Sequence, residues 1–257
     1  MICGRCKHIH VLGMYAIIGG TGLEQMDGVE EVQRHLLETP FGKPSSSLIE
    51  VIFEGKQVLF LSRHGEDHSI PPHKINYRAN LWALKEFGVE SVVGVAAVGG
   101  ITAATGPGQV VIPDQIIDYT WGREHTFFDG PEVEHIDFTT PYCKVLRESL
   151  LSAATADNVD VVSVATYGAT QGPRLESAAE IRRMEQDGCD IVGMTGMPEA
   201  ALAREIGLCY GCCAVSANWA AGKSEREITM EEINENLKEG MEGVRALLRQ
   251  LFRGTLV

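Results

Sequence analysis

The chain has 257 residues, is 44% hydrophobic and carries a formal net charge of −13, which fits a globular protein of one large α/β domain or two small ones. The acidic balance argues against a nucleic-acid partner, because such binding depends on clustered lysines and arginines, but a small anion can still bind at a locally positive site. No apolar run reaches the roughly 18 residues of a membrane span, and residues 1–13 lack the apolar core of a signal peptide, so we expect a cytoplasmic protein.

Short apolar segments alternate with amphipathic segments along the chain, which is typical of α/β proteins. Strands are predicted at 15–20, 51–55, 58–65, 91–100, 110–118, 159–168, 189–196 and 209–218. Helices are predicted over 76–88, 140–156, 176–188, 198–207 and 229–253, the last with Thr229 as its N-cap. The aromatic, acidic and histidine-rich segment 119–138 is expected to be a long functional loop. No linker or repeat interrupts the pattern, so we predict one domain over 14–257, preceded by a loose tail at 1–13.

Seven cysteines are present, and in a chain without an export signal free thiols are expected. Two CxxC spacings occur, at 3–6 and at 209–212, with His8 and His10 near the first. Together these residues could hold zinc. However, the second spacing lies in a strand-like run, where successive side chains point to opposite faces. Buried small side chains are therefore the preferred interpretation, and no metal site is predicted.

Several predicted strands end in polar or glycine-rich clusters: GGTGL, LSRHG, AAVGG, GATQGPRLES, GMTGMPE and SANWAAG. Ligands of α/β proteins collect where strands end, so the convergence of these clusters predicts a binding site. The first cluster does not complete a dinucleotide-binding G-x-G-x-x-G pattern, because Gln25 stands in place of the third glycine. Its turn could still offer backbone N–H groups and the Thr21 hydroxyl to an anion, or serve only as a tight turn.

Three further clusters carry side chains with both a chemical and a structural interpretation. Arg63 presents a planar fork of donors suited to phosphate, and His64 adds another. Thr195 precedes a helix N-terminus, where it could bind an anion or cap the helix. Met194 could press on a sugar or fill the core. Glu176 opens a predicted helix, where the helix dipole alone would favour a carboxylate.

Taken together, IIGGTGL, SRHG with NYRANLWAL, GPRLESAAEIRR, MTGMPEA and the SAN segment resemble the trimeric purine nucleoside phosphorylase family, and within it the methylthioadenosine phosphorylase branch. The resemblance runs in order from about Met14 to the final helix. It implies a single α/β domain with a mixed, twisted central sheet flanked by helices, assembled as a homotrimer. It also implies reversible phosphorolysis, in which phosphate displaces a purine from C1′ of a nucleoside, without a metal or organic cofactor.

Site residues follow from the resemblance by matching position. The phosphate site would consist of Thr21, Arg63, His64, Ala96, the backbone N–H of Ala97, and Thr195. Ala96 stands where the methylthioadenosine branch has a hydroxyl, so one phosphate contact would be missing or replaced. Met194 would pack against the ribose. The reaction would pass through an oxocarbenium-like sugar, stabilised by phosphate on one side and by a donor to the leaving purine on the other, with no covalent nucleophile.

The predicted base site differs from that of the methylthioadenosine branch, which has aspartates at the positions of Asn218 and Ala220. The Asn218 amide can donate to N7 and to a 6-oxo group, and the Glu176 carboxylate can accept from N1–H. These two residues, the predicted catalytic pair, match the 6-oxopurine phosphorylases. We therefore expect hypoxanthine or guanine as the base, with Trp219 and Ala220 beside it.

The predicted sugar site indicates a substrate with a 5′-methylthio group. Met230 and Ile233 fall where the methylthioadenosine branch lines its 5′ pocket with apolar residues, although core packing would explain both. His135 matches a histidine that reaches the 5′ end of the neighbouring subunit's substrate, although a surface position would explain it too. The combination resembles the methylthioinosine phosphorylases and implies phosphorolysis of 5′-methylthioinosine to hypoxanthine and 5-methylthioribose 1-phosphate.

Three other functions stay open from the sequence. A general inosine and guanosine phosphorylase would share the predicted base site. A methylthioadenosine phosphorylase is disfavoured by Asn218. A non-catalytic nucleoside-binding or redox module is suggested by GGTGL and the CxxC spacings, but the missing third glycine argues against nicotinamide binding.

Overall fold

One mixed sheet organises the chain. The computed structural model describes residues 13–20, 28–225 and 229–254, without the side chains of Met230 and Glu232. Within these residues eleven strands are hydrogen-bonded in the order β2-β3-β4-β1-β5-β10-β9-β7, and β11 joins β5 to the small strands β6 and β8. The strands are β1 (Met14–Gly19), β2 (Val29–His35), β3 (Leu48–Phe53), β4 (Lys56–Ser62), β5 (Val89–Gly100), β6 (Val110–Val111), β7 (Gln115–Asp118), β8 (Val161–Val162), β9 (Thr166–Ala169), β10 (Ile191–Gly193) and β11 (Cys209–Trp219).

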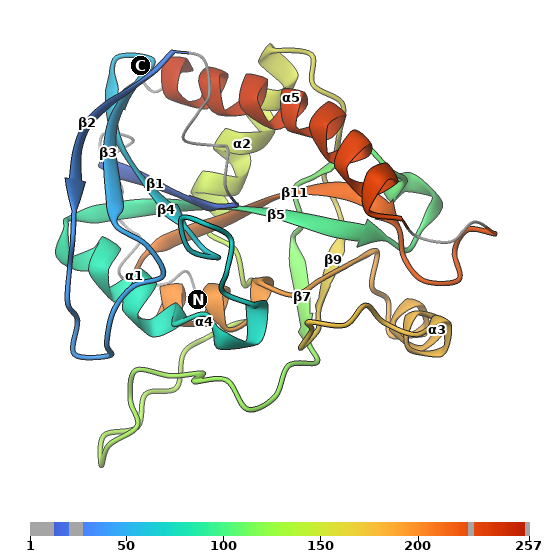
Figure 1. Ribbon diagram of the computed structural model, residues 1–257, viewed down its shortest axis with the longest axis horizontal. Helices are drawn as coiled ribbons and strands as arrows, with labels where there is room; N and C mark the ends of the chain where they lie inside the picture. Colours follow the sequence, from blue (N-terminus) through green and yellow to red (C-terminus); the bar gives the residue numbers. More distant parts are fainter. Residues whose placement is uncertain (1–12, 21–27, 226–228, 255–257) are drawn as a thin grey trace.

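The centre of the sheet is parallel. Strand β1 pairs in parallel with β4 and β5, and β5 pairs in parallel with β11 along almost its whole length. These strands are continuous apolar runs, as expected for strands that are covered by helices on both faces. Strands β5 and β11 cross the middle of the molecule together (Figure 1). Their carboxyl ends therefore reach the same edge of the sheet, where the predicted site residues follow.

Helices form a layer on each face of the sheet. On one face lie α2 (Lys144–Ala156) and α5 (Met230–Gly254), and on the other lie α1 (Tyr77–Glu86) and α4 (Gly196–Glu205) (Figure 1). Two separate clusters of buried side chains correspond to these two layers. Helix α3 (Ala178–Gln186) and two 3-10 turns (Pro72–Lys74 and Ala103–Thr105) complete the regular structure of the described residues. The predicted α/β class with a mixed central sheet and flanking helices is confirmed.

Most predicted elements occur close to their expected bounds, and the differences have local causes. Strand β2 was not predicted, because its side chains are mostly exposed and carry no apolar alternation. The predicted strand 110–118 is divided by Pro113, which cannot donate to a sheet ladder. Likewise 159–168 is split into β8 and the start of β9. Residues 119–138 hold no helix or strand, as expected for a loop, and no helix of the described chain is long and apolar enough to cross a membrane.

The cysteines differ from expectation. Cys143, just before α2, and Cys209, at the start of β11, form a disulfide, so the prediction of free thiols is wrong at these two positions. Cys212 is free and buried, and burial raises the pKa of its thiol. The CxxC spacing at 209–212 is therefore not a redox pair. The residues Cys3, Cys6, His8 and His10 lie outside the described part of the chain, as does all of the predicted tail except Gly13.

Candidate active site

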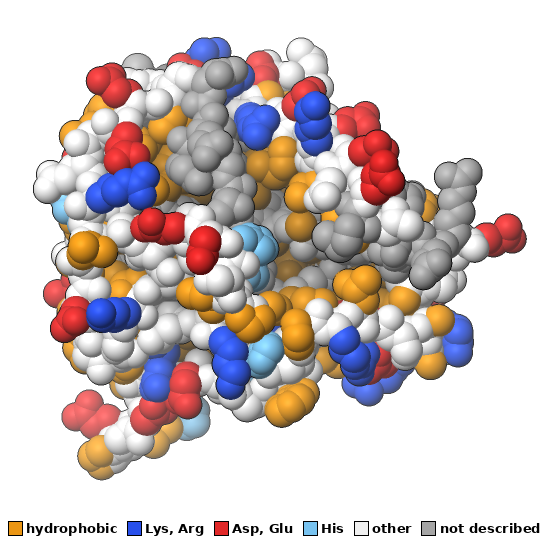
Figure 2. All heavy atoms as spheres, in the orientation of Figure 1, with side chains coloured by type: hydrophobic (Ala, Val, Ile, Leu, Met, Phe, Trp, Pro, Cys, Tyr) orange, Lys and Arg blue, Asp and Glu red, His pale blue; other side chains and the backbone are white. Residues whose placement is uncertain are grey.

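A cavity of about 610 Å³ lies beside the carboxyl ends of β5 and β11, and residues of α5 line one side of it. Figure 2 shows this face of the molecule hollowed near its centre. The volume lies within the roughly 300–1,000 Å³ that small-molecule sites occupy. Ten of the predicted site residues line this single cavity: Arg63, His64, Ala96, Ala97, Glu176, Met194, Thr195, Asn218, Ala220 and Ile233.

Of the other four predicted site residues, Trp219 and His135 do not line this cavity. The ring of Trp219 packs against Gly106 instead, with a Cβ at that glycine falling 3.1 Å from Cζ2 of the indole. His135 is exposed on the long loop between β7 and α2. Thr21 and the side chain of Met230 lie outside the described residues. The cavity thus brings together residues of the predicted phosphate site and of the predicted base site. Trp219 and His135 of this chain lie outside it.

Arg63, directly after β4, is held by a buried carboxylate, that of Glu199. Its Nε and Nη2 donate to the two carboxylate oxygens of Glu199 at 2.7 and 2.8 Å, and the two side chains are 2% and 1% exposed. Burial alone would lower the pKa of Arg63, but the Glu199 charge and its hydrogen bonds outweigh burial and raise that pKa above its ordinary value. The fork that we predicted for phosphate is therefore occupied by Glu199.

Arg63 keeps one donor beyond these contacts. A guanidinium has five N–H groups. Two are used by Glu199, one Nη2–H by the Ile18 carbonyl at 3.2 Å, and one Nη1–H by the Val95 carbonyl at 2.8 Å. A single Nη1–H remains, on a side chain that lines the cavity. Arg63 can thus present one directed donor to a ligand while its orientation is fixed from three sides.

His64 lines the same end of the cavity in a defined tautomer. Its Nδ1 lies 2.9 Å from the carbonyl oxygen of Ile70, and because a carbonyl only accepts, Nδ1 carries the hydrogen. Burial lowers the pKa of His64 to about 4. The ring is therefore neutral near pH 7, with the lone pair of Nε2 available to accept a hydrogen bond. His68 stacks on it at a centroid distance of 4.7 Å and also lines the cavity.

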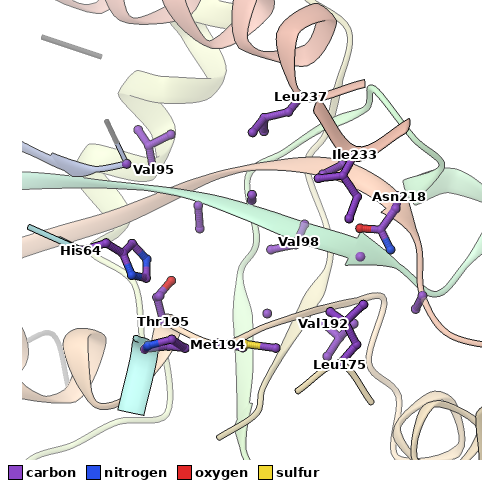
Figure 3. A pocket seen from close by; sticks show the side chains of 18 of the residues that line it. His64, Val95, Val98, Leu175, Val192, Met194, Thr195, Asn218, Ile233 and Leu237 are labelled. Atoms are coloured by element: carbon purple, nitrogen blue, oxygen red, sulfur yellow. The ribbon is translucent and has the colours of Figure 1, made fainter. Parts of the chain in front are cut away.

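Thr195 occupies the N-cap position of α4, but its side chain makes no capping hydrogen bond to that helix. It is 8% exposed and lines the cavity. Figure 3 shows His64 and Thr195 toward one end of the cavity, Asn218 and Ile233 toward the other, and Met194 between them. The capping role that would have explained Thr195 without a ligand is thus absent from the structure.

Asn218 enters the cavity because β11 is irregular at its end. The register with β5 shifts between Ser216 and Asn218, and such a bulge re-aims the side chains that follow it. The Asn218 Nδ2 donates to the Trp219 carbonyl at 2.7 Å, and Asn236 of α5 holds the Ala217 carbonyl at 3.0 Å. One N–H of the amide is therefore used locally, and the other N–H and the Oδ1 remain to meet a ligand.

Glu176 lies outside the helix in which we expected it. Helix α3 begins at Ala178, Ser177 is its N-cap, and Glu180 forms the capping box with Ser177. The explanation of Glu176 by the helix dipole is therefore wrong, since the acidic residue in the first turn of α3 is Glu180. Instead Glu176 lines the cavity, and its Oε1 accepts from the Thr170 hydroxyl at 2.6 Å.

One side of the cavity was predicted only through Ile233. Residues Ile233, Leu237, Met241 and Arg245 of α5 all line it. They repeat every four residues, so they share one helix face. Three were assigned no role, although this spacing was visible in the sequence. Only the register of α5 over the sheet, which the sequence does not give, decides that this face meets a cavity.

Comparisons with known proteins identify the family of the chain. A family model described as "Phosphorylase superfamily" matches residues 14–253. The "Probable S-methyl-5'-thioinosine phosphorylase" of Pseudomonas syringae pv. tomato is 52% identical over 93% of this chain and 98% of its own length. The "6-oxopurine nucleoside phosphorylase" of Pyrococcus furiosus is 43% identical over 91% of this chain and 89% of its own.

A solved structure extends the agreement to the fold. The methylthioadenosine phosphorylase of Schistosoma mansoni in complex with tubercidin has a TM-score of 0.86 and 32% identity, covering 93% of this chain and 90% of that one. The family model spans nearly the whole chain, and the relatives are matched over most of their length. This chain therefore belongs to the phosphorylase superfamily, as a nucleoside phosphorylase of the pentosyltransferase type.

Proposed function

We propose that the chain catalyses phosphorolysis of S-methyl-5′-thioinosine to hypoxanthine and 5-methylthioribose 1-phosphate. The proposal rests on one observation: Asn218 and Glu176 line the same cavity as Arg63 and His64. One end of the cavity then offers donors to an anion, and the other offers an amide and a carboxylate to a base. The relatives named as S-methyl-5′-thioinosine phosphorylases support this choice of substrate.

At the anion end, phosphate would accept from the remaining Nη1–H of Arg63 and from Thr195, with the backbone N–H of Ala97 and Thr21 completing the site. The neutral His64 would accept, through Nε2, from the hydroxyl of a monohydrogen phosphate. Ala96 has no hydroxyl to add. Each partner fixes one phosphate oxygen, so an oxygen would be aimed at C1′ of the sugar.

At the base end, the Glu176 carboxylate favours a 6-oxopurine. One N–H of Asn218 is bound to the Trp219 carbonyl, so this amide has a single N–H for the base and does not donate to both N7 and a 6-oxo group as we expected. The Glu176 Oε1 already accepts from Thr170, which leaves Oε2 to accept from N1–H of hypoxanthine. The remaining N–H of Asn218 would donate to N7, where negative charge grows as the C1′–N9 bond breaks. An adenine would place an N1 acceptor against the Glu176 carboxylate, and leaving such groups unpaired costs roughly four to five orders of magnitude in specificity.

In the sugar region, Met194 would pack on the ribose, and the 5′-methylthio group would meet an apolar wall. Ile233, Leu237 and Met241 supply that wall from α5, and Met230 would extend it. Ala220 would lie beside the base. Trp219 would not contact the substrate and would only help to position the end of β11. A sulfur substituent prefers such a surface to water, which distinguishes the substrate from inosine with its 5′-hydroxyl.

The proposal includes assembly and setting. The chain would form a homotrimer in the cytoplasm, and the exposed His135 would reach the 5′ end of a neighbouring subunit's site. No metal or organic cofactor would take part, and phosphate would be the co-substrate. The reaction needs no covalent nucleophile, because phosphate itself attacks the oxocarbenium-like sugar.

The experiment is a comparison of kcat/KM for methylthioinosine, inosine and methylthioadenosine with saturating phosphate. We expect methylthioinosine to exceed inosine, and both to exceed methylthioadenosine. Equal or better use of inosine would replace the proposal by a general 6-oxopurine phosphorylase, which the Pyrococcus furiosus relative favours. Preference for methylthioadenosine would overturn the roles of Asn218 and Glu176, and absence of phosphate-dependent base release would leave a nucleoside-binding protein.

A further inference from the structure

The anion end of the cavity lacks net positive charge from the two residues expected to supply it. Arg63 is paired at 2.7 Å with the equally buried Glu199, so the pair as a whole is neutral. His64 is neutral near pH 7 because burial lowers its pKa to about 4. A phosphate dianion brought into such a site loses its hydration and needs a compensating cation.

Arg245 is a lining residue whose charge is not compensated. Its Nε is buried and has no hydrogen-bond partner, although a buried donor of this kind normally has one. The structure gives it no ion pair with any described carboxylate. It follows Ile233, Leu237 and Met241 on the face of α5 that meets the cavity. Among the described residues, Arg245 is therefore a guanidinium without a carboxylate partner, and it lines a site in which the charge of Arg63 is already neutralised by Glu199.

Its place along α5 puts it at the anion end. Ile233 lies near Asn218 (Figure 3), and at the rise of an α-helix Arg245 is roughly 18 Å further along the axis. The same helix ends over the start of β1, where Phe252 contacts Tyr15 at a ring distance of 5.4 Å. Arg245 precedes Phe252 by seven residues, roughly 10 Å along the helix axis, and so lies toward the carboxyl end of β1. Gly20, directly after β1, lines the cavity, and the Arg63 backbone N–H donates to the adjacent Gly19 carbonyl at 2.9 Å.

We propose that Arg245 binds the phosphate co-substrate and supplies the positive charge that the Arg63–Glu199 pair does not. The inference rests on the proposed function, which makes phosphate a substrate, and it adds a residue that the matching of family positions did not assign. Arg63 would then orient phosphate through one N–H, whereas Arg245 would supply most of the attraction. A guanidinium suits the role because its planar fork matches two phosphate oxygens.

The test compares Arg245→Met with Arg245→Lys, and with Lys238→Gln as a control that removes a charge from the exposed side of the same helix. Methionine keeps the apolar stem and the helix propensity while it removes the charge. Loss of one charge-assisted contact should raise the KM for phosphate about tenfold or more. We expect the KM for nucleoside to stay within about twofold, Arg245→Lys to recover most of the phosphate affinity, and Lys238→Gln to match the wild type.

A phosphate KM in Arg245→Met within about twofold of the wild type would overturn the inference and leave the proposed function standing. A second measurement is the rise in melting temperature caused by inorganic phosphate relative to chloride at equal ionic strength. This measurement decides the role of Arg245 even if the wild type releases no base. A phosphate-induced rise in melting temperature that is lost in Arg245→Met and kept in Arg245→Lys supports the inference. A rise of equal size in the wild type and Arg245→Met, or no rise in either, overturns it.

Discussion

The guanidinium of Arg63 and the carboxylate of Glu199 meet through two hydrogen bonds of 2.7 and 2.8 Å in the interior of the protein. The contact ties the end of β4 to the first turn of α4, 136 residues away along the chain. Glu199 also accepts from the Tyr210 hydroxyl at 2.7 Å, which extends the tie to β11. The arginine that lines the cavity is therefore positioned by the same network that joins three elements of the fold.

Removal of one partner of this buried pair should be strongly destabilising. Glu199→Gln leaves the Arg63 charge buried without a counterion, which typically costs about 3–5 kcal/mol of unfolding free energy. Urea denaturation of the variant measures this directly. The control is Glu148→Gln, which breaks the exposed pair with Lys144 and should change the free energy by less than about 1 kcal/mol. A similar small loss in Glu199→Gln would mean that the pair contributes no net stabilisation.

The sequence predicts the fold well because its core strands are apolar runs and its helices have a clear apolar face. It predicts the cavity residues Asn218 and Thr195 for a related reason, since polar side chains at the ends of central strands converge on one edge. It could not pair Arg63 with Glu199, because both residues have a plausible local role and nothing in the sequence brings them together across 136 positions.

Other features depend on the packing of distant segments. The disulfide joins residues 66 positions apart, and nothing in the local sequence around Cys209, which was predicted to be a free thiol, indicates Cys143 as its partner. The side of α5 that lines the cavity is known only when the helix is placed on the sheet. Even the orientation of Asn218 depends on a bulge between β11 and β5, which no residue of the SANWAAG segment predicts.

The base site predicts opposite responses to two kinds of substrate. In Glu176→Gln the amide can turn a donor toward N1, so kcat/KM for 6-oxopurine nucleosides should fall roughly ten- to a hundredfold, as expected for a hydrogen bond to a charged group. The value for methylthioadenosine should stay the same or rise, which serves as an internal control for folding. Parallel loss on both substrates would show that Glu176 supports the loop through Thr170 and does not contact the base.

Asn218→Asp tests the other half of the base site. A carboxylate at this position loses the N–H proposed for N7 of a 6-oxopurine, and after protonation it can instead serve a 6-aminopurine. We expect weaker turnover of methylthioinosine and a shift in relative kcat/KM toward methylthioadenosine. An unchanged ratio of the two values would mean that Asn218 has a structural role, fixed by its hydrogen bond to the Trp219 carbonyl.

His64 should make the protein less stable in mild acid. Its pKa is about 4 in the folded chain, chiefly because of burial, against an ordinary value of 6.5. The unfolded chain therefore binds a proton first as the pH falls, so stability is complete above about 6.5 and declines down to about 4. Thermal unfolding of the wild type should lose more between these pH values than that of His64→Gln, in which this group is absent. Identical pH profiles would show that His64 is protonated equally in both states.

The disulfide between Cys143 and Cys209 should stabilise the fold by restricting the unfolded chain. For a loop of 66 residues, the chain-entropy estimate is about 4 kcal/mol. Dithiothreitol should therefore lower the melting temperature of the wild type and leave that of Cys143→Ser unchanged, since the other cysteines in the described part of the chain, Cys189, Cys212 and Cys213, are free. Because the bond anchors the start of β11 while Asn218 lies at its other end, reduction should affect stability far more than kcat/KM at a temperature well below the transition. An equal response of the wild type and Cys143→Ser would contradict the disulfide.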